Sequence, residues 1–133
     1  MPINYEINEK EKLIVAVGCG IVTGREVIEH IGSLANDNKY IAPMKKLVDY
    51  STIESIRISQ GEADTIANMK NRHINKFSGE KCAFVSPGDL TYGTARVHQA
   101  LVDSADISTQ VFRSIKEAKE WLDVGLDGNC EDG

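Results

Sequence analysis

The chain has 133 residues, which is the length of one ordinary protein domain. Hydrophobic residues make up 41% of it and charged residues 26%, values that exclude a chain that is disordered, collagen-like or coiled-coil throughout. Fifteen lysines and arginines against twenty aspartates and glutamates give a net charge of −5. A protein that follows the phosphates of a nucleic acid needs a basic surface, so we expect no nucleic-acid partner.

The amino-terminal segment and the cysteines favour a cytoplasmic protein. Residues 1–12 are polar and acidic and lack the basic flank and apolar stretch of a signal peptide. The longest apolar run, residues 13–17, is far shorter than the roughly 20 residues of a membrane span. Cys19, Cys82 and Cys130 form no C-x-x-C pair and have no metal-ligand spacing to a histidine. We therefore expect a reducing compartment, no membrane span, no metal and no cofactor.

Two hydrophobic periods alternate along the chain and predict its elements. Apolar residues at every second position, or in short continuous runs, predict strands, and apolar residues three and four apart predict helices. In chain order the pattern predicts strand 3–7, strand 13–17, helix 27–35, strand 46–50, helix 63–74, strand 81–85, helix 95–105, strand 107–112 and helix 115–122.

The starts of three helices carry a capping signal of their own. Thr23, Ser59 and Ser114 are each followed three residues later by a glutamate. In such a capping box, hydroxyl and carboxylate each accept a hydrogen bond from the other residue's backbone N–H. Three such segments, each directly before a helical pattern, support the same set of helices.

The order of elements predicts an α/β fold in one domain, residues 1–124. Strands that alternate with helices are joined by right-handed crossovers and so form parallel pairs. The first two strands are separated only by a polar turn, which predicts an antiparallel first strand at the edge. We expect a mixed sheet of four to five strands wrapped by about four helices. Residues 125–133 are small and acidic and predict a disordered tail.

Three stretches together resemble a known family. They are Leu47-Val48-Asp49, Tyr92-Gly93-Thr94-Ala95-Arg96, and Val111-Phe112-Arg113 followed by Glu117-Ala118-Lys119-Glu120-Trp121-Leu122. This combination resembles the SpoIIAA-like family of small bacterial proteins, which is related to STAS domains and more distantly similar to the lipid-binding Sec14 (CRAL-TRIO) type of fold. The resemblance covers residues 3–124 and implies a helix-wrapped sheet and a family largely without established activity.

STAS domains proper act as regulatory modules that bind partners and are often phosphorylated on serine. Their phosphoacceptor lies at a helix start directly after a strand that ends in aspartate. Here Ser51 follows the strand that ends at Asp49, whereas Ser59 has the helix-capping signal. The resemblance thus implies two candidate phosphorylation sites, Ser51 and Ser59, and neither combines both features.

The carboxyl ends of the parallel strands are where ligands of such sheets bind. Asp49 and Ser51 follow the middle strand there, and Tyr92 and Arg96 are four residues apart at the start of the third helix. A phenol and a guanidinium above a carboxylate form a candidate clamp for a polar or anionic ligand or a protein partner. The alternative interpretation is that Arg96 pairs with an aspartate and Tyr92 packs over the sheet edge.

Other chemistry-bearing residues favour structural interpretations. The segment from Gly18 to Gly24 has one residue too many for a dinucleotide fingerprint, so its glycines are expected in turns and caps. Cys19 has no histidine near it in the sequence, and His30, His73 and His98 are scattered. The basic residues at positions 70, 72, 76 and 81 are expected on a solvated face, with docking of an acidic partner as the alternative.

Three functions are consistent with this pattern. The first is a non-enzymatic regulatory or binding module that recognises a partner or small ligand through Asp49, Ser51, Tyr92 and Arg96. The second is a carrier of an apolar, lipid-like ligand between the sheet and the second and third helices. The third and weakest is an enzyme that uses Cys19 or His98. A homodimer, through helix faces or the edge strand 3–7, is compatible with each of them.

Overall fold

The computed structural model describes residues 3–88 and 108–124. Its main sheet has five strands in the order β1-β2-β4-β6-β7. The strands are β1 (Ile3–Asn8), β2 (Leu13–Gly18), β4 (Lys45–Asp49), β6 (Lys81–Val85) and β7 (Ser108–Phe112). Strand β1 pairs antiparallel with β2, and all other neighbours are parallel. The predicted mixed sheet with an antiparallel first strand at its edge is confirmed.

A second sheet of two parallel strands, β3 (Gly20–Thr23) and β5 (Ile53–Arg57), was not predicted. The sequence analysis placed the first segment in a turn and the second between a strand and a helix. Both strands are short and partly exposed, so their hydrophobic pattern is weak. Gly18 and Gly20 permit the bend that leads into β3. A Cβ at Gly18 would lie 2.7 Å from two ring carbons of Tyr50, and Gly20 has a φ of +63°.

The helices of the described residues are α1 (Gly24–Ala35), α2 (Gln60–Arg72), α3 (Ile74–Phe77) and α5 (Ile115–Leu122). The predicted capping boxes at Thr23 and Ser59 form with both reciprocal hydrogen bonds. At Ser114 the hydroxyl accepts the bond from the Glu117 N–H, and the return bond is not formed. The second helix ends earlier than predicted because His73 leaves the helical conformation at φ −103° and ψ 32°.

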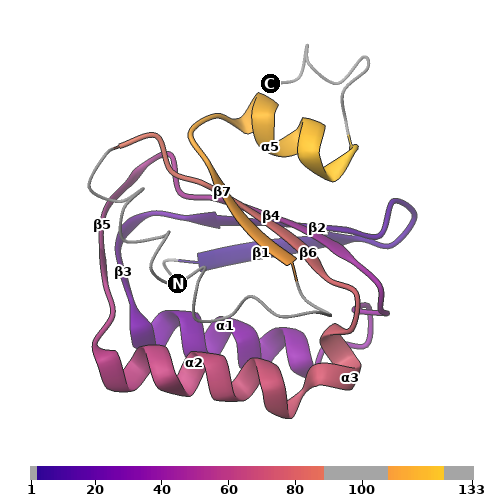
Figure 1. Cartoon of the computed structure of the whole chain (residues 1–133), viewed down its shortest axis with the longest axis horizontal. Helices are drawn as coiled ribbons and strands as arrows, with labels where there is room; N and C mark the ends of the chain where they lie inside the picture. The colour runs from indigo at the N-terminus through magenta and orange to yellow at the C-terminus, as the bar shows by residue number, and fades with distance from the viewer. Residues whose placement is uncertain (1–2, 89–107, 125–133) are drawn as a thin grey trace.

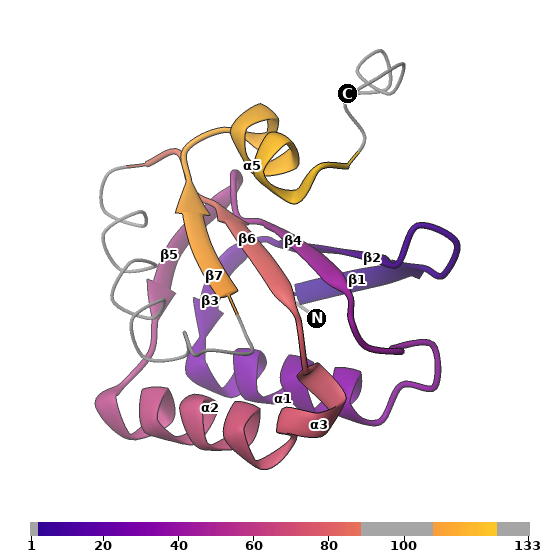
Figure 2. The ribbon, with the colours of Figure 1, turned by 45° about the vertical axis from the view of Figure 1, so that its right-hand side comes forward.

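The helices cover both faces of the main sheet (Figures 1 and 2). Helices α1, α2 and α3 lie on one face, and α5 lies on the other. Successive side chains of a strand point to opposite faces. In β4, therefore, Leu47 packs against α5 in a cluster with Ala118 and Leu122, whereas Lys46 and Val48 face α1 and α2.

Several predictions lie outside the described residues. These are the third helix over 95–105, the tail over 125–133, and the candidate residues Tyr92, Arg96, His98 and Cys130. Within residues 3–88 and 108–124, no helix is both long enough and apolar enough to cross a membrane.

Candidate functional site

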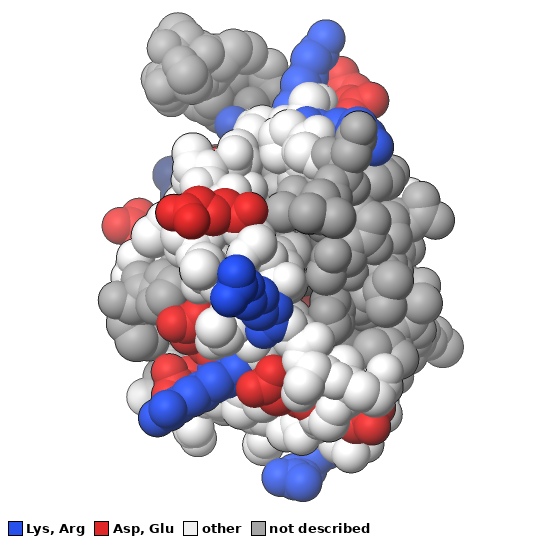
Figure 3. All heavy atoms as spheres, turned by 90° about the vertical axis from the view of Figure 1, so that its left-hand side faces the viewer, with Lys and Arg blue, Asp and Glu red and all other residues white. Residues whose placement is uncertain are grey.

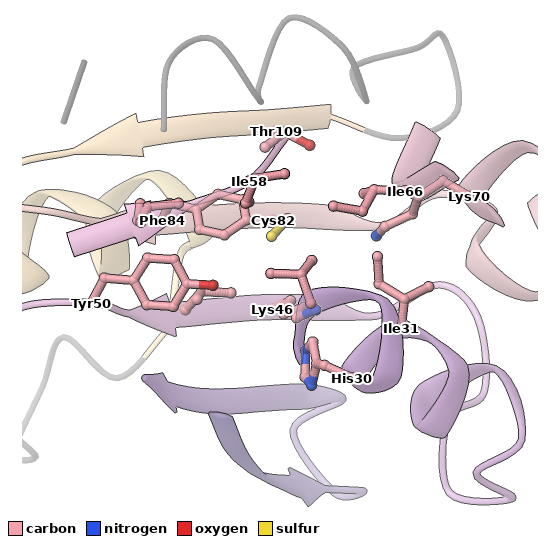
Figure 4. A pocket seen from close by; sticks show the side chains of 13 residues that line it. His30, Ile31, Lys46, Tyr50, Ile58, Ile66, Lys70, Cys82, Phe84 and Thr109 are labelled. Atoms are coloured by element: carbon pink, nitrogen blue, oxygen red, sulfur yellow. The ribbon is translucent and has the colours of Figure 1, made fainter. Parts of the chain in front are cut away.

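A cavity of about 70 Å³ lies between the main sheet and helices α1 and α2 (Figure 4). It receives side chains from both helices, from β4, β6 and β7, and from the β5 segment. The described residues that line it are Val27, His30, Ile31, Lys46, Val48, Tyr50, Ile56, Ile58, Ile66, Lys70, Cys82, Phe84 and Thr109. Most of this lining is aliphatic or aromatic, so the few polar groups within it define its chemistry.

One of these polar groups, the ammonium of Lys70, has its partner at the end of the cavity. Glu80 is 1% exposed, and its Oε1 accepts a hydrogen bond from Lys70 Nζ at 2.6 Å. Its Oε2 accepts another from the Tyr40 hydroxyl, also at 2.6 Å. Burial alone would raise the pKa of Glu80, but the charges of Lys70 and Lys46 and these two hydrogen bonds lower it. The carboxylate is ionised, and it neutralises Lys70.

Lys46 has no such partner. It is only 3% exposed, and no hydrogen bond or ion pair joins its Nζ to any described residue. Burial, and then the nearby charge of Lys70, lower the pKa of Lys46 from 10.5 to about 8. At neutral pH the side chain is still mostly protonated. A buried charge without a counter-ion is costly, and folded proteins almost always pair such groups.

His30 lies beside Lys46 (Figure 4). It is 6% exposed, and neither ring nitrogen has a hydrogen-bond partner among the described residues. Burial first, and then the charges of Lys46 and Lys70, lower the pKa of His30 from 6.5 to about 2. The imidazole is therefore neutral at physiological pH, with one N–H donor and one acceptor nitrogen.

Tyr50, Cys82 and Thr109 are the other polar side chains of the described lining, and all three are uncharged. Burial raises the pKa of Tyr50 above its ordinary value and that of Cys82 to about 11. The hydroxyl oxygen of Tyr50 points into the cavity (Figure 4), and no hydrogen bond connects it to a described residue. Among its described residues the lining thus has one positive charge without an ion-pair partner, several hydrogen-bond donors and no carboxylate.

The sequence analysis did not identify this site. His30 is there one of three scattered histidines, and Lys46 is only the first residue of the predicted strand 46–50. A signal was present, because Lys46 is two residues from the apolar Val48 and therefore lies on the same face of the strand. What the sequence could not show is which of two adjacent lysines, Lys45 or Lys46, points into the protein.

The sequence predicts a binding surface of four rim residues, at the carboxyl edge of the sheet: Asp49, Ser51, Tyr92 and Arg96. The structure shows two of them, Asp49 and Ser51, in contact. Ser51 follows Asp49, and both its backbone N–H and its hydroxyl donate hydrogen bonds to Asp49 Oδ1, the first at 2.9 Å. By strand alternation Asp49 is on the same face as Leu47, which is the α5 face and not the cavity face. Tyr92 and Arg96 are outside the described residues, so the clamp stays a prediction.

The two candidate phosphorylation sites are both exposed. Ser59 is the N-cap of α2, and its hydroxyl accepts a hydrogen bond from the Glu62 N–H at 3.1 Å. Ser51 precedes β5, so a strand separates it from the helix. Strand β5 is the physical reason that the aspartate-ended strand and the helix-capping serine are apart in this chain.

The basic residues at positions 70–81 do not form the expected solvated face. Lys70 is buried on Glu80, Lys76 donates to the Asp37 carbonyl at 2.9 Å, and Lys81 donates to the Trp121 carbonyl at 2.6 Å. Lys76 and Lys81 also lie over the rings of Tyr40 and Trp121. On the face shown in Figure 3, the basic and acidic side chains of the described residues are interspersed. Three of the four basic residues therefore have structural contacts.

Neither a metal site nor a dinucleotide-binding segment is found in the part of the chain that the structure describes. No group of three or more His, Cys, Asp or Glu side chains there could hold a metal ion. Strand β3 lies between Gly18 and the start of α1, so the glycine segment does not join a strand directly to a helix as a dinucleotide fingerprint does. Cys19 is an exposed free thiol between β2 and β3, and Cys82 is buried within β6, the strand predicted over residues 81–85.

Comparison with known proteins identifies the fold. No protein-family model and no curated protein matches the chain. Among solved structures, the chain is similar to an uncharacterised protein of the DUF3478 family with a SpoIIAA-like fold from Shewanella loihica PV-4. The TM-score is 0.56 at 16% sequence identity, over 90% of this chain and 91% of the other. The chain therefore has the SpoIIAA-like fold that the sequence resemblance predicts.

Proposed function

We propose that the protein is a non-enzymatic binding module that holds a small organic ligand in the cavity between the main sheet and helices α1 and α2. The observation that carries this proposal is the set of buried polar groups without partners around an otherwise apolar space. Proteins pair more than nine-tenths of such groups, and each exception in a folded protein calls for a physical reason. A ligand that binds Lys46, His30 and Tyr50 supplies that reason.

The size of the cavity limits the ligand. Pockets for drug-sized molecules have volumes of about 300–1,000 Å³, whereas one water needs about 10–15 Å³. A cavity of about 70 Å³ accommodates a molecule of only a few non-hydrogen atoms, or one end of a longer one. The predicted alternative function, a lipid carrier, requires a larger cavity than this one. It stays the second candidate function because the lining of the cavity is mostly apolar.

The predicted recognition of a protein partner is compatible with this proposal. Asp49 and Ser51 lie where β4 ends, and the neighbouring residue Tyr50 lines the cavity. A ligand that contacts Tyr50 would thus contact the residue that lies between Asp49 and Ser51 in the chain, and its binding could alter the positions of both. A surface formed by Asp49, Ser51, Tyr92 and Arg96, together with phosphorylation of Ser51 or Ser59, stays a prediction for the regulatory role.

A binding screen by NMR tests the proposal. Amide spectra of the ¹⁵N-labelled protein are recorded with small carboxylates, amides, alcohols and amines of three to six non-hydrogen atoms. We expect at least one class to shift resonances of the cavity lining, and Val27→Phe, which fills part of the cavity from α1, to weaken that binding. The matched control is Val17→Phe, because Val17 is 42% exposed on β2 and does not line the cavity.

Absence of saturable shifts at the lining with every class would contradict the proposal. Native mass spectrometry of the freshly purified protein tests the alternative carrier function. A persistent added mass of lipid size would replace the small-ligand proposal with the carrier, and a protein of unmodified mass argues against the carrier.

A further inference from the structure

We propose that the ligand of this cavity is a small carboxylate, whose oxygens accept hydrogen bonds from Lys46 Nζ, the His30 ring N–H and the Tyr50 hydroxyl. This inference rests on the proposed function and names the class of ligand.

The charge of the cavity favours a monoanion. Lys70 and Glu80 form a closed pair at 2.6 Å, and the second oxygen of Glu80 is held by Tyr40. Lys46 therefore stays as one positive charge without a counter-ion among the described residues. Removing a charge from water costs several kcal/mol unless an opposite charge and hydrogen bonds replace the lost hydration. A ligand with a single negative charge supplies both, whereas a cationic ligand would be repelled.

The hydrogen-bonding groups favour an acceptor. An ammonium has three N–H donors, a neutral imidazole has one, and the Tyr50 hydroxyl donates one more. None of these has a partner among the described residues. An ionised carboxylate only accepts hydrogen bonds, through about four lone-pair directions on two oxygens. The head group that satisfies these donors most completely is therefore a carboxylate.

The remaining surface favours a short apolar body next to that head group. Val27 and Ile31 line the cavity from α1, and Phe84 lines it from β6, so hydrocarbon surface adjoins the polar groups. Tyr50 and Phe84 have ring centroids 5.7 Å apart and form one wall together. Phosphate and sulfate have no apolar part that could contact this hydrocarbon surface. We therefore assign the site to a carboxylate with a short aliphatic group.

Matched pairs of isosteric probes test the assignment. Propionate is compared with propionamide, and isobutyrate with isobutyramide, by NMR titration at pH 7. The amide has the shape of the acid but no charge. For the wild-type protein we expect each carboxylate to bind at least tenfold more tightly than its amide. Inorganic phosphate is the third probe, and tighter binding of phosphate than of both carboxylates would overturn the assignment.

Lys46→Met and Lys45→Met separate the two lysines of β4. Both changes remove one ammonium, but Lys45 is outside the cavity lining. We expect Lys46→Met to lose the preference for the carboxylate while it still binds the amide, and Lys45→Met to keep the preference. Equal affinity for acid and amide in the wild type, or a preference that survives in Lys46→Met, contradicts the carboxylate assignment alone. If no carboxylate binds but an alcohol or an amine of the screen does, the assignment fails and the proposed function stands. If no class of the screen shifts the cavity resonances, the proposed function fails as well.

Discussion

The two faces of the main sheet bury different kinds of side chains. On the α5 face, Leu47, Ala83 and Val85 pack against Ala118 and Leu122 of the helix, and the cluster is entirely apolar. On the other face, beside α1 and α2, the buried residues include His30, Lys46, Lys70 and Glu80. Both faces thus have an apolar core, but the core beside α1 and α2 also encloses a cavity with buried polar groups. Burying such groups without partners costs stability.

Two adjacent lysines of β4 show the difference most directly. Lys45 is partly exposed, and its Nζ donates to the carbonyl of Asp123 at 3.5 Å, beside α5. Lys46 is 3% exposed and has no partner among the described residues. A buried charge whose cost is not offset by contacts within the folded protein is typical of a binding site, where a ligand completes the interactions. The comparison therefore predicts that substitution of Lys46 changes the stability of the protein and that of Lys45 hardly does. Within the α1 and α2 side, it predicts a loss of stability at Glu80 and a gain at Lys46.

The largest effect is expected at Glu80, the ion-pair partner of Lys70 among the described residues. Glu80→Gln leaves Lys70 and Lys46 buried without an anion, and loss of one partner of a buried pair costs about 3–5 kcal/mol. Urea unfolding at pH 7 measures the change. Glu29→Gln is the control, since Glu29 forms an exposed pair with Arg25 and should change the stability by less than about 0.5 kcal/mol. A loss at Glu80 as small as at Glu29 would contradict the buried network.

A gain in stability is expected for Lys46→Met. The pKa of Lys46 falls from 10.5 in the unfolded chain to about 8 in the folded one. Between these values the unfolded state holds a proton that the folded state lacks, so the wild-type stability rises with pH across this window. Below pH 8 the full cost is present, about 3 kcal/mol at about 1.4 kcal/mol for each pH unit.

Lys46→Met removes this cost. Urea unfolding should show the variant more stable than the wild type by about 3 kcal/mol at pH 7, with the difference shrinking towards pH 10.5. Lys45→Met should stay close to the wild type at all pH values, because Lys45 lies outside the cavity. A Lys46→Met protein that is less stable than the wild type at pH 7 would show that Lys46 has a stabilising partner in the ligand-free protein.

A smaller gain is expected for His30→Leu. Neither ring nitrogen of His30 has a partner among the described residues, and an unsatisfied buried polar group costs about 1–3 kcal/mol. The pKa of His30 is lowered from 6.5 to about 2, so between these values only the unfolded chain binds the proton. The wild-type stability therefore falls as the pH falls below 6.5.

His30→Leu should remove this acid sensitivity. Thermal unfolding from pH 7 to pH 4.5 measures it, and His73→Leu, at the half-buried end of α2, is the matched control. If His30→Leu loses stability on acidification as steeply as the wild type does, the imidazole is not the group responsible.

The smallest effects are expected at the helix starts. Ser59→Ala removes the cap of α2, and Thr23→Ala that of α1, each at a cost of about 1 kcal/mol. Ser114→Ala should cost less, because its capping box has only one of the two reciprocal bonds. Urea unfolding of the three variants gives the order, and a larger loss at Ser114 than at Ser59 would contradict it.

Much of the fold is predictable from the sequence because local patterns and the sheet agree. The strands of the main sheet are found from apolar residues in short runs or at alternate positions, and the two helices with complete capping boxes begin where Thr23 and Ser59 indicate. The pair β3 and β5 is not predictable in the same way, because each strand is partly exposed and is stabilised by the other across 30 residues of chain or more.

The candidate site is less predictable than the fold. The rim residues Asp49 and Ser51 are found from their position after a strand, which is a local feature. The cavity depends on which way Lys46 points and on the distance between Lys70 and Glu80, and both follow from packing between elements. A lysine within a strand and a histidine within a helix are each ordinary in sequence, and only the fold brings them together.

The pKa of Lys46 tests the central claim most directly. Nuclear magnetic resonance of the lysine side chains follows its titration in the ligand-free protein, with Lys70, Glu80, His30 and Cys82 as the ionisable neighbours. Our account predicts a pKa of about 8 for Lys46 that rises when propionate is added, while propionamide has no such effect. An ordinary lysine pKa near 10.5, unchanged by propionate, would contradict it.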